Sequence, residues 1–227
     1  MKVLVFNGSP RGKNSKTMIL TNKFIEGLNY WGDNDVKIVE IKNKKIEHCL
    51  GCFACWKKEP FKCIIDDDMS DVLNLIIKSE LIIWSFPLYH YNVPSKMKSL
   101  MDRTLPLSPL NIRKQNYYGI LPDNTNKKHI IISTCGLNED NYSSINDMFS
   151  LNYGEKNLEH IYLKAGECIN IIGCEALSNY LNIVKTAGME YYLFKKFSES
   201  TKNVLNKPIF DSETYQQALE AWINDCP

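Results

Sequence analysis

Five short apolar runs, separated by stretches with helical periodicity, constrain the fold of this chain more than any other feature. The runs are Val3–Phe6, Val36–Ile41, Leu81–Phe86, His129–Thr134 and Ile169–Gly173. Near-continuous apolar runs of this length are typical of parallel strands that helices cover on both faces. Strands and helices alternate along the chain, and this order predicts an α/β domain with a doubly wound, five-stranded parallel sheet.

Apolar residues at intervals of three and four predict the helices between these strands. The helices are expected over Leu20–Leu28, Met69–Ile76, Met97–Met101, Ile145–Phe149, Leu158–Tyr162 after a break near Gly154, and Leu177 to about Lys196. Asp66–Asp68 supply acids for the start of the second helix, and Asp211 or Ser212 can cap a last one. We expect one domain over residues 1–202 and a helical tail over residues 203–227.

Charge and hydropathy argue against two classes of partner, nucleic acids and membranes. Lys and Arg number 27 against 26 Asp and Glu, and the lysine clusters are scattered, so the nucleic-acid class is disfavoured. The N-terminal apolar run has four residues, too few for a signal peptide, and no run approaches the ~18 residues of a membrane span. We therefore expect a cytoplasmic protein that does not enter a membrane.

Loops at the carboxyl ends of the strands are where doubly wound sheets bind ligands. The first such loop, NGSPRGKNSKT, offers the hydroxyls of Ser9, Ser15 and Thr17 beside the amides of a helix start, which suits a phosphate group. Its spacing fits neither G-x4-G-K-[ST] nor G-x-G-x-x-G, so a mononucleotide is favoured over ATP or NAD. The alternative is a capped helix start that binds nothing.

Two further loops are predicted at the same edge. After the third strand, Tyr89, His90 and Tyr91 could hold the face and polar edge of a flat heterocycle, or could simply be aromatic residues anchored at the surface. After the fourth strand, residues 134–136 (Thr-Cys-Gly) lie where a ligand that crosses the strand ends would pass. Gly136 permits close approach of a ligand to the backbone.

Four of the eight cysteines fall in the stretch HCLGCFACWKKEPFKC, which follows the second strand. They are Cys49, Cys52, Cys55 and Cys63. The C-x2-C-x2-C-x7-C spacing is compatible with a disulfide, a zinc site, an iron–sulfur cluster or free thiols. A reducing compartment favours metal or redox chemistry over disulfides. Against a cluster, the gap before Cys63 contains Pro60 and the bulky Trp56 and Phe61, which could direct its thiol away from the others.

The motifs NGSPRGKNSKT, C-x-G-C-x-x-C-W, DDM, FPLYHYNVPSKMKSLMDR and CG occur in this order between Lys2 and Gly188. Together they resemble the NADPH-dependent FMN reductase family of flavodoxin-like flavoproteins, close to its iron–sulfur flavoprotein branch. The resemblance implies the strand order 2-1-3-4-5, tightly bound FMN and a homodimer or homotetramer. The exposed aromatics Phe53, Trp56 and Phe61 also favour self-association.

The resemblance also implies which residues would bind FMN. The expected phosphate contacts are Ser9, Arg11, Ser15, Lys16 and Thr17, and the expected ring contacts are Pro87, Leu88, Tyr89, His90, Tyr91, Asn92, Thr134, Cys135 and Gly136. Lys16 stands where relatives often have Asn, and His90 and Tyr91 stand where many have Trp and Gly.

The implied function is an oxidoreductase that passes electrons from NAD(P)H through FMN to a small acceptor such as a quinone, a nitroaromatic or a flavin. No side chain is assigned a catalytic role, because the flavin carries the chemistry. The alternative is a non-enzymatic electron carrier that serves a redox protein partner and holds a 4Fe–4S cluster on the four cysteines.

Overall fold

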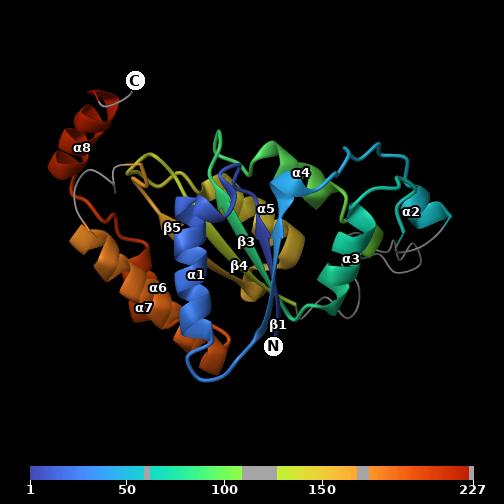
Figure 1. Ribbon diagram of the computed structural model, residues 1–227, viewed down its shortest axis with the longest axis horizontal. Helices are drawn as coiled ribbons and strands as arrows, with labels where there is room; N and C mark the ends of the chain where they lie inside the picture. Colours follow the sequence, from blue (N-terminus) through green and yellow to red (C-terminus); the bar gives the residue numbers. More distant parts are fainter. Residues whose placement is uncertain (59–61, 109–126, 168–173, 225–227) are drawn as a thin grey trace.

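Five parallel strands form one sheet in the order β2-β1-β3-β4-β5 (Figure 1). The computed structural model describes residues 1–58, 62–108, 127–167 and 174–224. The strands are β1 (Lys2–Asn7), β2 (Asp35–Glu40), β3 (Leu81–Pro87), β4 (Lys128–Thr134) and β5 (Leu158–Leu163). The strand order reverses beside β1, where β2 lies on one side and β3 on the other. This is the flavodoxin-like fold that the sequence predicted.

Helices cover both faces of the sheet, and side chains that alternate along each strand serve the two faces in turn. In β1, Val3 and Val5 pack in one core cluster and Leu4 and Phe6 in the other. The helices against the first face are α1 (Lys16–Leu28), α6 (Cys174–Phe194), α7 (Glu199–Leu205) and α8 (Ser212–Asn224). Those against the second face are α3 (Met69–Lys78), α4 (Ser95–Asp102) and α5 (Ser143–Tyr153).

Two glycines let α1 and α6 approach until their backbones touch. A Cβ atom on Gly27 would lie 1.9 Å from the carbonyl oxygen of Lys185, and one on Gly188 would lie 2.2 Å from that of Phe24. No side chain fits at either position, so any larger residue must push the two helices apart. This contact fixes the C-terminal half of α1 against α6.

The fifth strand is not the one that the sequence predicted. We expected helix over Leu158–Tyr162, but this segment is β5 and pairs in parallel with β4, with Leu163 opposite Thr134. Its apolar residues fit a period of two as well as a helical one, since Ile161 and Leu163 face one core and Leu158 and Tyr162 the other. The segment forms a strand and not a helix because the edge of β4 offers backbone N–H and C=O groups with which it can pair. The predicted strand Ile169–Gly173 lies outside the described residues.

The C-terminal helices pack on the sheet domain. Asp211 accepts a hydrogen bond from the amide of Thr214 at 2.8 Å and so caps α8, as expected. Leu205 and Phe210 belong to the same core cluster as α1 and α6. The boundary predicted after residue 202 falls within α7. No helix in the described part of the chain is long and apolar enough to cross a membrane.

Short 3₁₀ turns and one short helix complete the described structure. The 3₁₀ turns are Gly12–Asn14, Ile41–Asn43, Leu105–Leu107 and Glu155–Asn157. The short helix α2 (Ala54–Lys57) belongs to the cysteine loop, defined here as the described residues 46–58 and 62–67, and α2 lies beyond α3 (Figure 1).

Candidate functional site

The carboxyl ends of β1, β3 and β4 meet at one edge of the sheet, and three loops leave from it. We call these loops, residues 8–17, 87–92 and 134–136, the rim. Cross-strand hydrogen bonds hold it together: the amide of Gly8 donates to the carbonyl of Ser85 at 2.8 Å, and the amide of Leu88 donates to that of Thr134 at 2.8 Å. The structure therefore brings together the three loops that the sequence singled out.

The first rim loop presents buried hydroxyls at the start of α1. Ser9, Ser15 and Thr17 are each at most 3% exposed. The Ser15 Oγ accepts from the amide of Met18 at 3.2 Å and caps the helix, and the Ser9 Oγ accepts from the amide of Arg11 at 3.3 Å. Each hydroxyl still has its own O–H to donate. A helix that begins at Lys16 also leaves its first amides without intrahelical acceptors, so the loop is suited to an anion.

Lys16 and Arg11 both lie beside Glu167. The Lys16 ammonium donates to the carbonyl of Gly166 at 2.7 Å and to a Glu167 carboxylate oxygen at 3.1 Å. The Arg11 guanidinium, whose side chain is 65% exposed, lies 3.7 Å from the other carboxylate oxygen. The sequence left open whether Lys16 faces a phosphate or solvent. In the structure this side chain links the start of α1 to the segment after β5.

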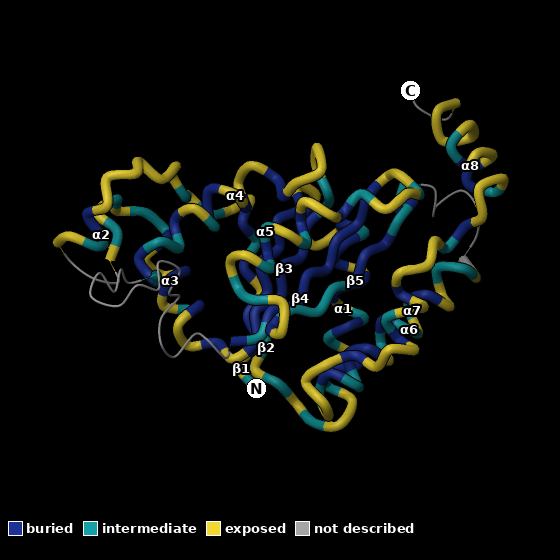
Figure 2. Tube along the Cα trace, turned by 180° about the vertical axis from the view of Figure 1, so that it is seen from behind, coloured by how far each residue is buried: buried dark blue, intermediate teal, exposed yellow. Residues whose placement is uncertain are grey.

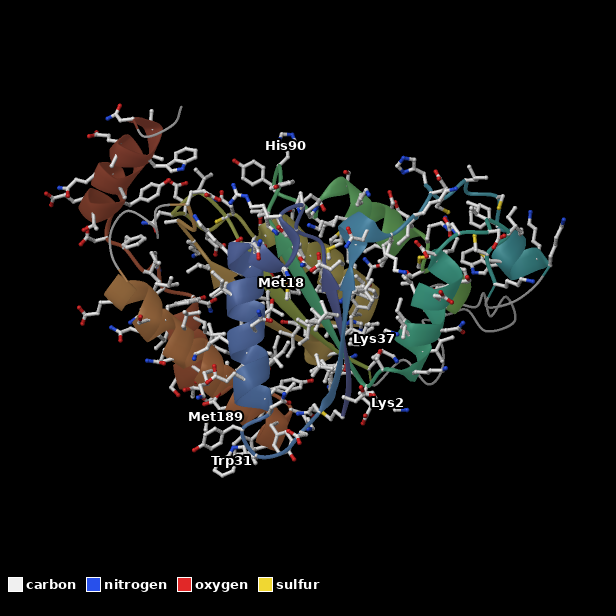
Figure 3. The ribbon with its side chains drawn as sticks, in the orientation of Figure 1. Lys2, Met18, Trp31, Lys37, His90 and Met189 are labelled. Carbon is white, nitrogen blue, oxygen red and sulfur yellow. The ribbon has the colours of Figure 1, made fainter. Side chains whose placement is uncertain are left out.

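The second rim loop is a tight hairpin. Tyr89 and Asn92 exchange two backbone hydrogen bonds of 2.9 Å, which leaves His90 and Tyr91 as the two turn residues. Both have positive φ, 49° and 59°, which is the conformation of a type I′ turn and is costly for residues other than Gly, Asn or Asp. His90 lies at the tip of this hairpin and points away from the sheet (Figure 3).

The third rim loop is joined to the first through a pair of hydroxyls. The Thr134 Oγ1 lies 2.8 Å from the Thr17 Oγ1, and both side chains are buried. Cys135 is 7% exposed, and burial raises the pKa of its thiol. Beside it, the Gly136 carbonyl accepts from the Tyr215 hydroxyl at 3.3 Å, which places α8 next to the rim.

Residues that the sequence did not single out also build the rim. The fully buried Asn7 accepts from the amide of Ser9 at 3.1 Å and donates to Glu40 at 3.1 Å. The segment of Gly166 and Glu167 contacts both Lys16 and Cys135, because the Gly166 amide donates to the Cys135 carbonyl at 2.7 Å. The segment of Gly166 and Glu167 was not singled out because the fifth strand was expected after it. Asn7 was not singled out because an asparagine at the end of a strand belongs to no recognisable sequence pattern.

The four cysteines of the cysteine loop line one small cavity. Its wall is made of Cys49, Leu50, Cys52, Phe53, Cys55, Cys63, Ile64, Ile65, Asp102, Arg103, Leu105 and Pro106. Cys49 and Cys52 are exposed, Cys55 is buried in α2, and Cys63 lies in neither a helix nor a strand. Burial, followed by the charges of the other three cysteines, raises the pKa of Cys55. The Trp56 indole donates to the Leu105 carbonyl at 3.2 Å and so is anchored locally.

Two findings bear on whether this cavity suits a metal. All five cysteines with described side chains are free thiols, so the disulfide alternative has no support among them. No three His, Cys, Asp or Glu side chains in the described ranges are grouped to hold a metal ion. A single zinc ion is therefore disfavoured there. A cluster makes a different demand, because each of its thiolates binds a different iron and the sulfurs stand further apart.

A buried ion pair fastens the cysteine loop to α4. Arg103 ends α4 and donates through two guanidinium nitrogens to the two carboxylate oxygens of Asp67, each at 2.9 Å. Burial opposes ionisation of Asp67, but hydrogen bonds from Arg103 and from the amides of Glu47 and Met69 outweigh it and lower its pKa. The sequence drew attention to the DDM and MDR motifs only as family signatures. Their partnership across 36 residues required the structure.

These features define a doubly wound α/β protein whose switch-point rim is suited to an anionic mononucleotide and whose cysteines surround a cavity nearby. Residues 1–117 match the NADPH-dependent FMN reductase family, and the chain belongs to that family.

Comparison with known proteins finds two kinds of similar protein, namely curated proteins that match part of the sequence and solved structures that share the fold. An iron-sulfur flavoprotein of Archaeoglobus fulgidus is 35% identical over 121 residues, covering 52% of each protein. An iron-sulfur flavoprotein of Methanosarcina thermophila is 32% identical over 120 residues, covering 52% of this chain and 60% of that protein. The chain thus spans only about half the length of the curated relatives it matches.

Solved structures share the fold at low sequence identity. An FMN-dependent NADH-azoreductase from Bacillus anthracis, in complex with FMN, has a TM-score of 0.63 at 17% identity, covering 85% of this chain and 100% of that one. An NAD(P)H:quinone oxidoreductase from Methanothermobacter marburgensis has a TM-score of 0.61 at 15% identity, covering 84% of this chain and 96% of that one.

Proposed function

We propose that this protein is an FMN-dependent oxidoreductase that takes electrons from NAD(P)H and delivers them to a small acceptor. The observation that carries the proposal is the first rim loop, where the buried hydroxyls of Ser9, Ser15 and Thr17 lie at the start of α1, beside the switch of strand order. Membership of the FMN reductase family supports it, as does the FMN named in the azoreductase structure. Bound FMN would supply the redox chemistry itself.

The protein's own contribution is binding, orientation and exclusion of water. The Ser9, Ser15 and Thr17 hydroxyls and the first amides of α1 would hold the phosphate, and the positive end of the helix dipole favours its charge. Tyr89 and Tyr91, which are 50% and 53% exposed, would offer aromatic faces to the ring or to the acceptor. The Thr17–Thr134 hydroxyl pair would fix the distance between the phosphate end and the third loop.

The test compares a double variant at the first rim loop with a control variant in α1. Ser9→Ala combined with Thr17→Val removes two rim hydroxyls, and each hydrogen bond to a charged group is worth about 1.5–3 kcal/mol. The dissociation constant for FMN, measured by flavin fluorescence, should rise at least a hundredfold. Thr21→Val is the control, because Thr21 lies one turn further along, equally buried, with its hydroxyl 2.8 Å from that of Ser85. If the double variant binds FMN like wild type, the assignment of this loop is wrong.

A second candidate, an electron carrier with a 4Fe–4S cluster, is favoured by one observation: all four cysteines line the same cavity. Four thiolates are the ligand set of such a cluster. The helix α4 runs from the second rim loop to this cavity and has eight residues, so it spans about 12 Å. The iron-sulfur flavoprotein relatives support this candidate by name.

Rapid mixing with NADPH separates the two candidates. An oxidoreductase should lose its flavin absorbance within the first turnovers after NADPH is added. A carrier should stay oxidised with NADPH and bleach only with a reduced ferredoxin or dithionite. Purification without oxygen should yield about four irons per chain if the cysteines hold a cluster, whichever electron donor the protein uses.

A further inference from the structure

Arg103 carries a positive charge into the wall of the cysteine cavity and is itself almost completely shielded from water. The residue is 1% exposed and lines the cavity together with the four cysteines. An isolated buried charge is costly, so its neighbours must account for it. Asp67, whose side chain is fully buried, balances this charge but accepts only some of the hydrogen bonds that the guanidinium can donate.

The hydrogen bonds of the guanidinium leave one of its three nitrogens without a partner. One terminal nitrogen donates to Asp67 and to the Glu47 carbonyl, each at 2.9 Å, and the other donates to Asp67 at 2.9 Å. The remaining nitrogen, Nε, is buried and makes no hydrogen bond of ordinary geometry with a described residue, although the guanidinium interacts with the Cys63 side chain. A buried N–H without an acceptor is unusual in a folded protein and indicates a ligand group on that side.

The charges around the cavity point to an anionic ligand. The Arg103 guanidinium pairs with Asp67 and also interacts with Cys63, one of the proposed cluster ligands. Arg103 also lies at the end of α4, where the helix dipole is negative. Asp102 lines the cavity too, but its carboxylate is half exposed and lies 2.6 Å from the Lys98 ammonium. Arg103 is thus the buried cation among the described residues of the wall.

We propose that Arg103 is a positioning residue that sets the reduction potential of a four-thiolate iron–sulfur cluster, with Nε donating to a cluster or cysteine sulfur. The inference rests on the proposed cluster and gives the cavity wall a role beyond ligation. A cluster becomes one charge more negative when it takes up an electron. A fixed positive charge and a hydrogen bond to sulfur both stabilise that reduced form and raise the potential. Asp67 holds the guanidinium in place and partly offsets its charge.

The experiment compares anaerobically purified variants by iron content and by redox titration with dithionite and mediators, followed by electron paramagnetic resonance. Arg103→Gln removes the charge and Nε, and should lower the equilibrium constant for one-electron reduction roughly tenfold, a shift of about 59 mV. Arg103→Lys keeps the charge without Nε and should give roughly a threefold decrease. Asp67→Asn should shift the constant in the opposite direction, because it leaves the positive charge unopposed. Lys98→Gln, an exposed charge on the same helix, should change it less than twofold.

The outcomes distinguish a tuning role from a structural one. If Arg103 only braces the loop, Arg103→Gln and Asp67→Asn should change the potential in the same direction or leave it within twofold of wild type, and either result overturns the inference. Opposite shifts support it. Wild-type protein without iron overturns both the cluster and the role of Arg103, whereas an iron-loaded wild type with an unchanged Arg103→Gln potential overturns the role alone. Arg103→Lys provides the same comparison if Arg103→Gln does not fold.

Discussion

The rim and the cysteine loop lie at the same edge of the sheet but are held in place by different forces. Hydrogen bonds of backbone groups and neutral hydroxyls, such as Gly8–Ser85 and Thr17–Thr134, hold the rim together. Its three loops directly follow the ends of three buried strands. The cysteine loop contributes no strand to the sheet and depends on the ion pair of Asp67 with Arg103. Figure 2 shows the contrast, since β1, β3 and β4 are mostly buried and the loop around α2 is mostly exposed.

The difference teaches how each region can fail. Apart from the ion pairs of Lys16 and Arg11 with Glu167, the rim is supported by many weak neutral contacts. The loss of any one should therefore be tolerated, and the geometry of the rim should depend less on pH than that of the cysteine loop. The cysteine loop concentrates its support in one buried charged pair, which is strong only while both partners are ionised. A loop fastened in this way can carry a redox group close to the sheet without being part of its hydrogen-bonded ladder.

The largest expected effect comes from breaking that pair. Asp67→Ala leaves the Arg103 guanidinium buried and unpaired, which should lower the free energy of unfolding by about 3–5 kcal/mol. Asp102→Ala, which removes the exposed partner of Lys98, should cost less than about 1 kcal/mol. Urea unfolding followed by circular dichroism measures both. Equal losses would show that the cysteine loop is held by something other than this pair.

Acid should loosen the cysteine loop before the rim. The pKa of Asp67 in the folded protein is lowered from 3.8, so the pair stabilises the fold fully above that value and is lost as pH falls through the folded pKa. Two thiols report on the two regions, since Cys55 is 8% exposed in the loop and Cys135 is 7% exposed at the rim. With iron-free protein and a dithiodipyridine reagent, the Cys55 rate should rise relative to that of Cys135 below pH 3.8. A constant ratio of the two rates would contradict the contrast.

The smallest expected effect concerns one strained aromatic residue in each region. Tyr91 in the rim hairpin has φ 59°, and Phe53 in the cysteine loop has φ 54°. Tyr91→Gly should relieve this strain and stabilise the protein by up to about 1 kcal/mol. Phe53→Gly should gain less, because the Phe53 ring lies 5.1 Å from that of Trp56 and such pairs contribute about 0.5–1.5 kcal/mol. Thermal unfolding resolves the order, and a larger gain for Phe53→Gly would reverse the ranking.

Patterns with one physical solution were predictable from the sequence. Runs such as Leu81–Phe86 are apolar on both faces and fit only a buried strand, which settled the fold class and the position of the rim loops. The hydroxyls of Ser9, Ser15 and Thr17 were predictable as a group because a helix start needs a cap and a strand end needs a turn. The FMN contacts predicted at the rim remain predictions, and so does self-association. Of the aromatics that suggested it, Phe61 lies outside the described residues.

The fifth strand shows where local pattern fails. The segment Leu158–Leu163 satisfies a helical and a strand periodicity alike, so its own residues could not choose between them. The free edge of β4 made the choice, because strand pairing satisfies backbone groups that would otherwise stay open. The same holds for Lys16, whose partner Glu167 is 151 residues away.

The sequence by itself determined the fold class, the first four strands and the loops at the carboxyl edge of the sheet, because periodicity and turn residues act over a few neighbours. Only the tertiary structure decided that the four cysteines share one cavity and that Arg103 stands in its wall opposite Asp67. Charges and thiols have no periodic signature, and their roles depend on partners that the fold brings from distant parts of the chain. Burial makes these partners important, because a charge that is well solvated in water becomes costly in free energy once it is buried without an oppositely charged or hydrogen-bonding partner.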